Sequence, residues 1–159
     1  MMSTLLQDFG GLLGIDLAFD ENDQCLLEVG GKLLVSIRKK GEDYSLYGML
    51  GDFPDVVEGD FWRDVLAENT HLVESDDGVI CLEASTDCLV LIKNVRIFQL
   101  DALGLKSNVE NFVNTQERLI AQFSAGDVEA EPTVDEISGD DERRGESQDF
   151  HPGFHAIKV

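Results

Sequence analysis

Two short turns between apolar, strand-like segments are the feature of this sequence that most restricts its fold. Residues 25–29 and 33–38 flank the pair Gly30-Gly31, and a second polar turn leads into a third extended segment at 44–50. A glycine pair is typical of a tight hairpin because primed turns need positive φ. Parallel pairing would need a long crossover connection, so we expect these three segments to form an antiparallel sheet.

Apolar residues recur with helical spacing in three segments, and a second hairpin separates the last two. The predicted elements are, in chain order, a helix over 5–13, a helix over 55–69, hairpin strands over 79–83 and 88–93, and a helix over 107–125. With the three strands described above, the order is α-β-β-β-α-β-β-α. This order predicts an α+β fold in which helices pack on a twisted antiparallel sheet.

Residues at the helix ends support these boundaries. Thr4 and Gln7 fit a capping box at the start of the first helix, and residues 107–110 fit a second box at the start of the last one. Two glycines lie inside the first helix, Gly10 and Gly11, and each costs about 1 kcal/mol relative to alanine. Tight packing and a closely approaching partner are the two explanations that the sequence leaves open.

The balance of charge limits the partners of this chain. It holds 32 acidic and 12 basic residues, a formal net charge of −20. Nucleic acids and anionic membranes both need a cationic footprint, so we expect neither as a direct partner. No apolar run reaches the roughly 18 residues of a membrane span, and the N-terminus lacks the basic start of a signal peptide.

Composition changes near residue 126. Residues 126–159 hold ten acidic and three basic residues with no apolar period. We therefore predict a folded domain over residues 1–125 and a disordered acidic tail over 126–159. Phe150 and Phe154 are two aromatic residues in the polar setting of this tail. We interpret them as part of a solvated tail, with a short docking segment as the alternative.

The sequence offers little material for catalysis. His71 is the only histidine before residue 126, whereas acid–base chemistry near neutral pH usually relies on histidine. No nucleophile elbow, phosphate loop or metal-ligand spacing occurs. Cys25, Cys81 and Cys88 lie among strand-like residues without a CxxC pair, which indicates structural thiols in a reducing cytoplasm. We predict no enzyme activity, no catalytic residue, no metal site and no cofactor.

Several landmarks follow one another in the order of a known family. They are the opening helix with Leu5, Leu6 and Phe9, the segment from Leu13 to Glu21, the strand 25–29, Pro54 ahead of the segment from Phe61-Trp62 to Asn69, the run Cys88 to Leu91, and Asn111-Phe112-Val113. Over about Leu5 to Phe123 the chain resembles the class I type III secretion chaperones of bacteria, the Tir chaperone family. Val65-Leu66 stands where the family commonly has a doubled leucine.

The resemblance implies a small homodimer in the bacterial cytoplasm. Such a protein would bind the N-terminal chaperone-binding region of one or more effectors, keep it extended and help deliver it to the secretion apparatus. The ATPase of that apparatus is a further candidate partner, and no nucleotide hydrolysis is expected. Two other functions stay open: an adaptor or anti-regulator of the same fold that binds a regulatory protein, and an acidic mimic of nucleic acid.

Holding an extended segment requires backbone pairing at a sheet edge and apolar pockets for alternate side chains. We predict the effector-binding residues on the first helix and the adjoining strands. They are Leu6, Phe9, Leu13, Phe19, Val35 and Ile37. The alternative for each is the domain's own core, because amphipathic residues usually face inward.

The dimer interface is predicted on the second helix, at Phe61, Trp62, Val65 and Leu66. Adjacent helical positions point about 100° apart. We therefore expect Phe61 and Val65 to face the sheet while Trp62 and Leu66 face a twofold mate. A fully internal Trp62 is the alternative, since so large a side chain is often buried.

Overall fold

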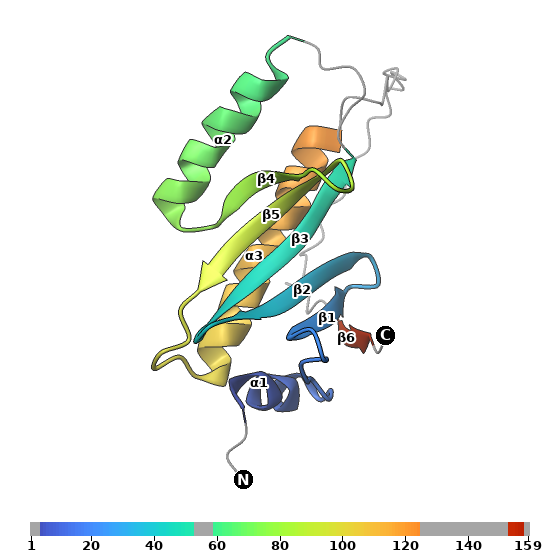
Figure 1. Ribbon diagram of the computed structural model, residues 1–159, viewed down its shortest axis with the longest axis vertical. Helices are drawn as coiled ribbons and strands as arrows, with labels where there is room; N and C mark the ends of the chain where they lie inside the picture. Colours follow the sequence, from blue (N-terminus) through green and yellow to red (C-terminus); the bar gives the residue numbers. More distant parts are fainter. Residues whose placement is uncertain (1–3, 53–58, 125–152, 158–159) are drawn as a thin grey trace, which may run out of the picture.

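An antiparallel sheet organises the chain in the computed structural model, which describes residues 4–52, 59–124 and 153–157 (Figure 1). Its strands are β1 (Gln24–Val29), β2 (Leu33–Lys40), β3 (Asp43–Asp52), β4 (Val79–Glu83), β5 (Cys88–Val95) and β6 (Phe154–Ile157). Within the described residues the strand order is β4-β5-β3-β2-β1-β6, and every neighbouring pair is antiparallel. The three-strand meander predicted from the turns is confirmed.

Helix α1 (Leu5–Leu13) has the predicted ends. The backbone N–H of Gln7 donates to Thr4 Oγ1 at 3.3 Å, and the N–H of Thr4 donates to Gln7 Oε1 at 3.0 Å, which completes the capping box. Gly14 ends the helix in the left-handed region at φ 71°, where glycine carries no steric penalty.

The other two helices differ from their predicted bounds. Helix α2 (Phe61–Ser75) continues beyond residue 69, because Leu72 extends its buried side, and ends at Asp76 with φ 57°. The start predicted at residue 55 lies outside the described residues. Helix α3 (Ala102–Ser124) begins before the predicted box at 107–110, so that box is wrong. Leu105 is fully buried in the core, and the N–H of Gly104 donates to Asp101 Oδ1 at 2.7 Å, which places the start at the aspartate.

The core lies between α3 and one face of the sheet. In Figure 1, α3 runs behind the sheet, α1 lies at the end near the N-terminus, and α2 stands beside β4. Alternate strand residues point at α3, as the pleat requires. The fully buried members of this core are Leu6, Phe9, Leu27, Val35, Ile37, Leu46, Leu91, Leu105, Val109 and Leu119.

The predicted α+β class and the order α-β-β-β-α-β-β-α are confirmed. The prediction of a disordered tail is wrong for residues 154–157, which form β6 on the edge of β1. Residues 126–152 and 158–159 of the predicted tail lie outside the described residues. None of the described helices has the length and apolar character needed to cross a bilayer.

Candidate peptide-binding surfaces

Strand β1 is the last but one strand at one end of the described sheet, and its outer side carries an extended segment of the same chain, β6. Leu26 pairs with Ile157 and Val29 pairs with Phe154, and the N–H of Gly30 donates to the carbonyl of Gly153 at 2.7 Å. Phe154 and Ala156 are half-buried against the core. The β1 edge is therefore shaped to accept an extended strand with alternate apolar side chains.

The opposite edge, β4, is closed by a side chain. Asn69 of α2 accepts from the N–H of Ile80 at 2.7 Å and donates to its carbonyl at 3.2 Å. The amide thus takes both backbone groups that an added strand would use at this position. Asn69 ends the segment that resembles the family, but its bonding partner could not be inferred from sequence.

The six predicted effector-binding residues divide into two groups. Leu6, Phe9, Val35 and Ile37 are each 0% exposed and belong to the domain's own core. The structure corrects the prediction for these four, because a side chain without exposed surface cannot contact a client in this conformation. The amphipathic pattern that suggested them is the one that also builds a core.

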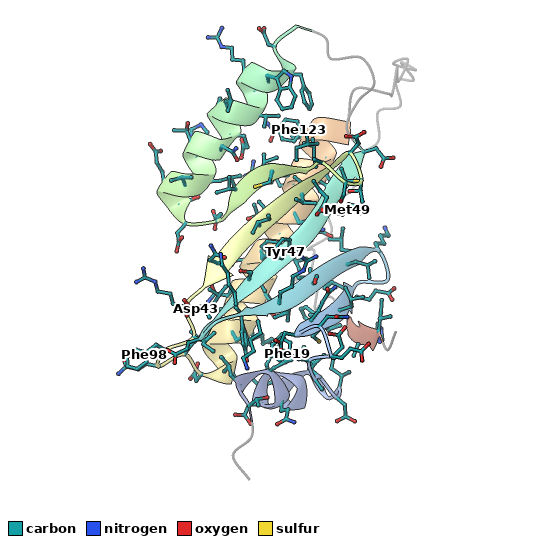
Figure 2. All side chains as sticks on the ribbon, viewed as in Figure 1. Phe19, Asp43, Tyr47, Met49, Phe98 and Phe123 are labelled. Atoms are coloured by element: carbon teal, nitrogen blue, oxygen red, sulfur yellow. The ribbon has the colours of Figure 1, made fainter. Side chains whose placement is uncertain are left out.

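Leu13 and Phe19 are the two that keep partial exposure. Both are half-buried: Leu13 is the last residue of α1, and Phe19 lies on the stretch that joins α1 to β1. The ring of Phe19, which is labelled in Figure 2, meets that of Tyr44 edge-on, with centroids 5.2 Å apart. Burial raises the pKa of the Tyr44 phenol, an effect partly offset by a hydrogen bond with the backbone of Leu6. Phe19 is thereby fixed in position and still presents part of its surface.

Helix α2 has an inner and an outer apolar side. Val65 is 4% exposed and packs in the core, and the ring of Phe61 packs edge-on against Phe123 at 6.0 Å. Trp62 and Leu66 are 43% and 66% exposed. The two pairs therefore point to different sides of the helix, and Trp62 is not internal within the single chain. Whether Phe61, Trp62, Val65 and Leu66 contact a second copy stays a prediction.

An ion pair between the half-exposed Arg118 and the largely buried Glu68 joins α2 to α3. Arg118 Nη2 lies 2.6 Å from Glu68 Oε1, and the side chain of Glu68 is 10% exposed.

The exposed apolar side of α2 continues to Val73, which is 64% exposed. Val73 lies 11 residues after Trp62, about three helical turns along, and so on the same side of the helix. We call Trp62, Leu66 and Val73 the α2 stripe.

The face of the sheet turned away from α3 also carries exposed apolar residues, which the sequence analysis did not single out. Leu34 and Met49 are 48% and 57% exposed. Tyr47 lies two residues before Met49 on the same face (both are labelled in Figure 2), and its ring is covered by the Arg38 guanidinium at 3.9 Å. Phe98, in the turn after β5, is 84% exposed. Such surfaces suit a protein that works by contact.

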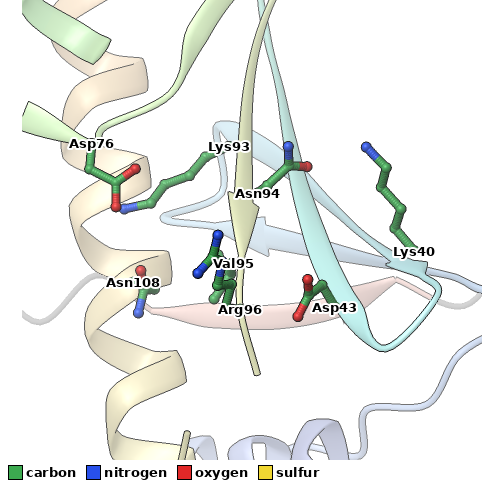
Figure 3. A pocket seen from close by; sticks show the side chains of 8 residues that line it. All are labelled: Lys40, Asp43, Asp76, Lys93, Asn94, Val95, Arg96 and Asn108. Carbon is green, nitrogen blue, oxygen red and sulfur yellow. The ribbon is translucent and has the colours of Figure 1, made fainter. Parts of the chain in front are cut away.

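A polar cavity of about 750 Å³ lies near the ends of β3 and β5 (Figure 3). It is lined by Lys40, Asp43, Asp76, Lys93, Asn94, Val95, Arg96 and Asn108. Some of its polar groups already serve the fold: Asp43 accepts from the N–H of Ile97 at 3.2 Å, and Asn94 accepts from the Ser45 hydroxyl at 2.6 Å. Its charges are mixed, and they do not select one class of ligand.

The residues available for chemistry are few. Across the ranges that the structure describes, no three His, Cys, Asp or Glu side chains come together as a metal site. Cys25, Cys81 and Cys88 are free thiols. Burial raises the pKa of the Cys25 and Cys81 thiols, which lowers the fraction of reactive thiolate.

A family match covers most of the part of the chain that forms the three helices and the sheet. The model of the Tir chaperone protein (CesT) family matches residues 4–120. The chain belongs to this family. The resemblance to class I type III secretion chaperones is confirmed, and the prediction of a chaperone for type III secretion effectors is supported. The Tir chaperone family is a chaperone family and not a family of enzymes.

Solved structures share this fold at low sequence identity. A chain of the HopA1–SchA chaperone–effector complex is 17% identical, with a TM-score of 0.64 over 73% of this chain and 90% of that one. A chain of the ExsC–ExsE complex is 20% identical, with a TM-score of 0.61 over 72% of this chain and 86% of that one. The Yersinia pestis type III secretion chaperone SycH, solved with a fragment of YscM2, is 17% identical, with a TM-score of 0.58 over 72% of this chain and 96% of that one.

Proposed function

We propose that this Tir chaperone family member is a cytoplasmic homodimer that holds the N-terminal region of type III secretion effectors in an extended conformation. It keeps that region secretion-competent and brings the complex to the secretion apparatus, where the ATPase is its further partner. The protein works without a cofactor, a metal or a catalytic step. Its net charge of −20 keeps the carrier soluble and attracts basic client segments.

The observation that carries this proposal is the pairing capacity of the β1 edge. An extended, uncharged segment already lies along β1 in antiparallel register, with Phe154 and Ala156 half-buried on the core side. A client strand bound there would obtain backbone hydrogen bonds from β1 and apolar contacts for every second side chain. Leu13 and Phe19 are partly exposed beside the start of β1 and are the predicted residues that remain available for such contacts.

The second copy is assigned to the α2 stripe. Trp62, Leu66 and Val73 expose apolar surface along one side of a helix whose other side is held by the core and by Arg118. An apolar stripe of this kind buries well against a twofold copy of itself. The β4 end of the sheet carries α2, whereas the client edge lies at the other end.

The test is purification of the tagged chain from its native bacterium, identification of the co-purified protein, and re-binding of that protein in fragments. We expect an exported protein whose N-terminal fragment binds on its own. A transcriptional regulator as the client would support the anti-regulator instead, and a DNA-binding protein released by added duplex would support the nucleic-acid mimic.

A pair of phenylalanine variants then locates the site. Phe19→Ala is expected to weaken binding of the N-terminal fragment about tenfold, equivalent to about 1.4 kcal/mol. Phe98→Ala removes a ring that is 84% exposed in the turn after β5, outside the α1–β1 stretch, so it is the control and should bind like the wild type. Equal affinity of both variants would remove the α1–β1 stretch from the client site.

A further inference from the structure

The strand on the β1 edge belongs to the chain itself, and it covers the groups that a client strand would use. Four residue pairs join β6 to β1, from Leu26 with Ile157 to Val29 with Phe154. An unoccupied edge strand would present a row of free N–H and C=O groups. Here that row is filled before any client arrives.

β6 is an addition to the fold that the family shares. The family match ends at residue 120, whereas β6 begins at Phe154. Within the matched part, β1 is the last strand on its side of the sheet. The shared fold therefore presents β1 as an edge, and this chain places its own C-terminal segment there.

The domain does not depend on β6 for its core. The buried core draws residues from all three helices and from β1 to β5, and none from β6. Phe154 and Ala156 are half-buried, while His155 and Ile157 are exposed. Residues 153–157 contain no charged side chain, although 126–152 carry ten acidic and two basic ones. A short, uncharged pairing segment that contributes nothing fully buried can leave without opening the core.

We propose that β6 is an intramolecular plug: it occupies the position on β1 where the client strand would pair, and it must leave before a client binds there. This inference rests on the proposed function, because it takes β1 as the client edge. The register also gives the chemistry of the client strand that replaces it. That strand carries a large apolar side chain opposite Val29, where Phe154 lies, and a small one opposite Leu27, where Ala156 lies.

His155 allows a matched test because its side chain is exposed. Hydrogen-bonded and non-hydrogen-bonded residue pairs alternate along an antiparallel ladder. Gly30 and Gly153 form a hydrogen-bonded pair, so His155, two residues further along, also occupies a hydrogen-bonded position, opposite Glu28. His155→Pro removes this N–H and breaks the pairing without changing the core. His155→Thr keeps the N–H and is a good strand former. Both changes are made in the full chain.

The probe is a fluorescein-labelled synthetic peptide with the sequence of residues 150–159, and its binding is followed by fluorescence anisotropy. We expect His155→Pro to bind the peptide at least about tenfold more tightly than the wild type or His155→Thr. This ratio follows if the outer side of β1 is free of β6 in no more than about one wild-type molecule in ten. Phe154→Asp, which puts a charge at a half-buried position, is a second variant expected to behave like His155→Pro. Circular dichroism checks that each variant is folded.

Two results would overturn the plug: equal peptide affinity for all of these proteins, or no binding to any of them. An exported client that binds the wild type and His155→Pro equally well would also overturn it, yet would leave the proposed function standing. The proposed function fails separately if the peptide discriminates between the variants but no exported client is found for either protein.

Discussion

Replacing Gly10 by alanine tests how tightly α1 is held against the segment that leads into β1. A Cβ at this position would lie 2.6 Å from the carbonyl oxygen of Ile15 and 3.0 Å from the nitrogen of Leu17. Both are backbone atoms, so no side-chain rotation relieves the contact. The N–H of Ile15 also donates to the Gly10 carbonyl at 3.0 Å. Gly11, the next residue, has no atom within 4 Å of its would-be Cβ.

The two glycines should therefore respond in opposite directions. Overpacking at Gly10 costs about 1–3 kcal/mol, and a strained Ile15 hydrogen bond adds about 1 kcal/mol, against about 1 kcal/mol gained in helix propensity. The net expectation is a loss of about 1–3 kcal/mol. Gly11→Ala keeps only the propensity gain and should stabilise the domain by about 0.5–1 kcal/mol.

Urea unfolding followed by far-ultraviolet circular dichroism measures both variants at one protein concentration, since self-association would make the midpoint depend on concentration. With a slope near 2 kcal/mol per molar urea, a loss of 2 kcal/mol lowers the midpoint by about 1 M. A Gly10→Ala protein as stable as the wild type would refute the close approach of α1 to residues 15–17. A destabilised Gly11→Ala would refute the assignment of the cost to that approach.

Three further predictions follow from particular contacts. Asn69→Ala leaves both backbone groups of Ile80 unpaired and should lower the free energy of unfolding by about 1–3 kcal/mol, whereas Asn69→Asp, which retains an acceptor, should lose less; equal losses would contradict the edge-capping role. Trp62→Ala should weaken dimerisation in sedimentation velocity while Arg63→Ala does not, and an unchanged dimer at low micromolar concentration would contradict it. The raised pKa of Cys25 favours the neutral thiol in the folded state, so iodoacetamide should label it only on unfolding. Rapid labelling of the native protein would contradict its burial. The stability that the neutral thiol contributes is present below about pH 9 and is lost as the pH rises above that value, because the thiol of the unfolded chain ionises first.

The parts of the fold that were predicted correctly are those determined by neighbouring residues. The capping box of Thr4 and Gln7 and the left-handed Gly14 act within one turn of α1, so sequence alone located both ends. The box at 107–110 is an equally good local pattern, yet it lies inside α3. Burial of Leu105, a tertiary effect, extended the helix past that pattern. Local signals compete with packing, and packing decided the outcome.

The candidate site was harder to predict because its elements pair across the length of the chain. Phe154 lies opposite Val29, so no local period could show β6. Its only sequence signal was a short uncharged segment with two aromatic residues in an otherwise acidic tail. The helical spacing of Leu6 and Phe9 could not tell a core residue from a client contact, because both require an apolar side chain on one face. Exposed fractions, which need the tertiary structure, separated Phe19 from them.

The two ends of the sheet are closed in different ways, and this difference separates the proposed client site from the proposed dimer surface. The Asn69 cap on β4 is carried by α2, which Glu68 ties to α3 through a 2.6 Å ion pair. Removing β6 from β1 breaks four residue pairs, and none of the side chains that leave with β6 is fully buried. Strand exchange is therefore favoured at β1, while the α2 stripe, the surface proposed for a second copy, lies at the far end of the sheet. It follows that Trp62→Ala, introduced into the His155→Pro chain, should leave the affinity for the 150–159 peptide unchanged even when it disrupts the dimer. A parallel loss of dimer and peptide binding would mean that the two surfaces are coupled.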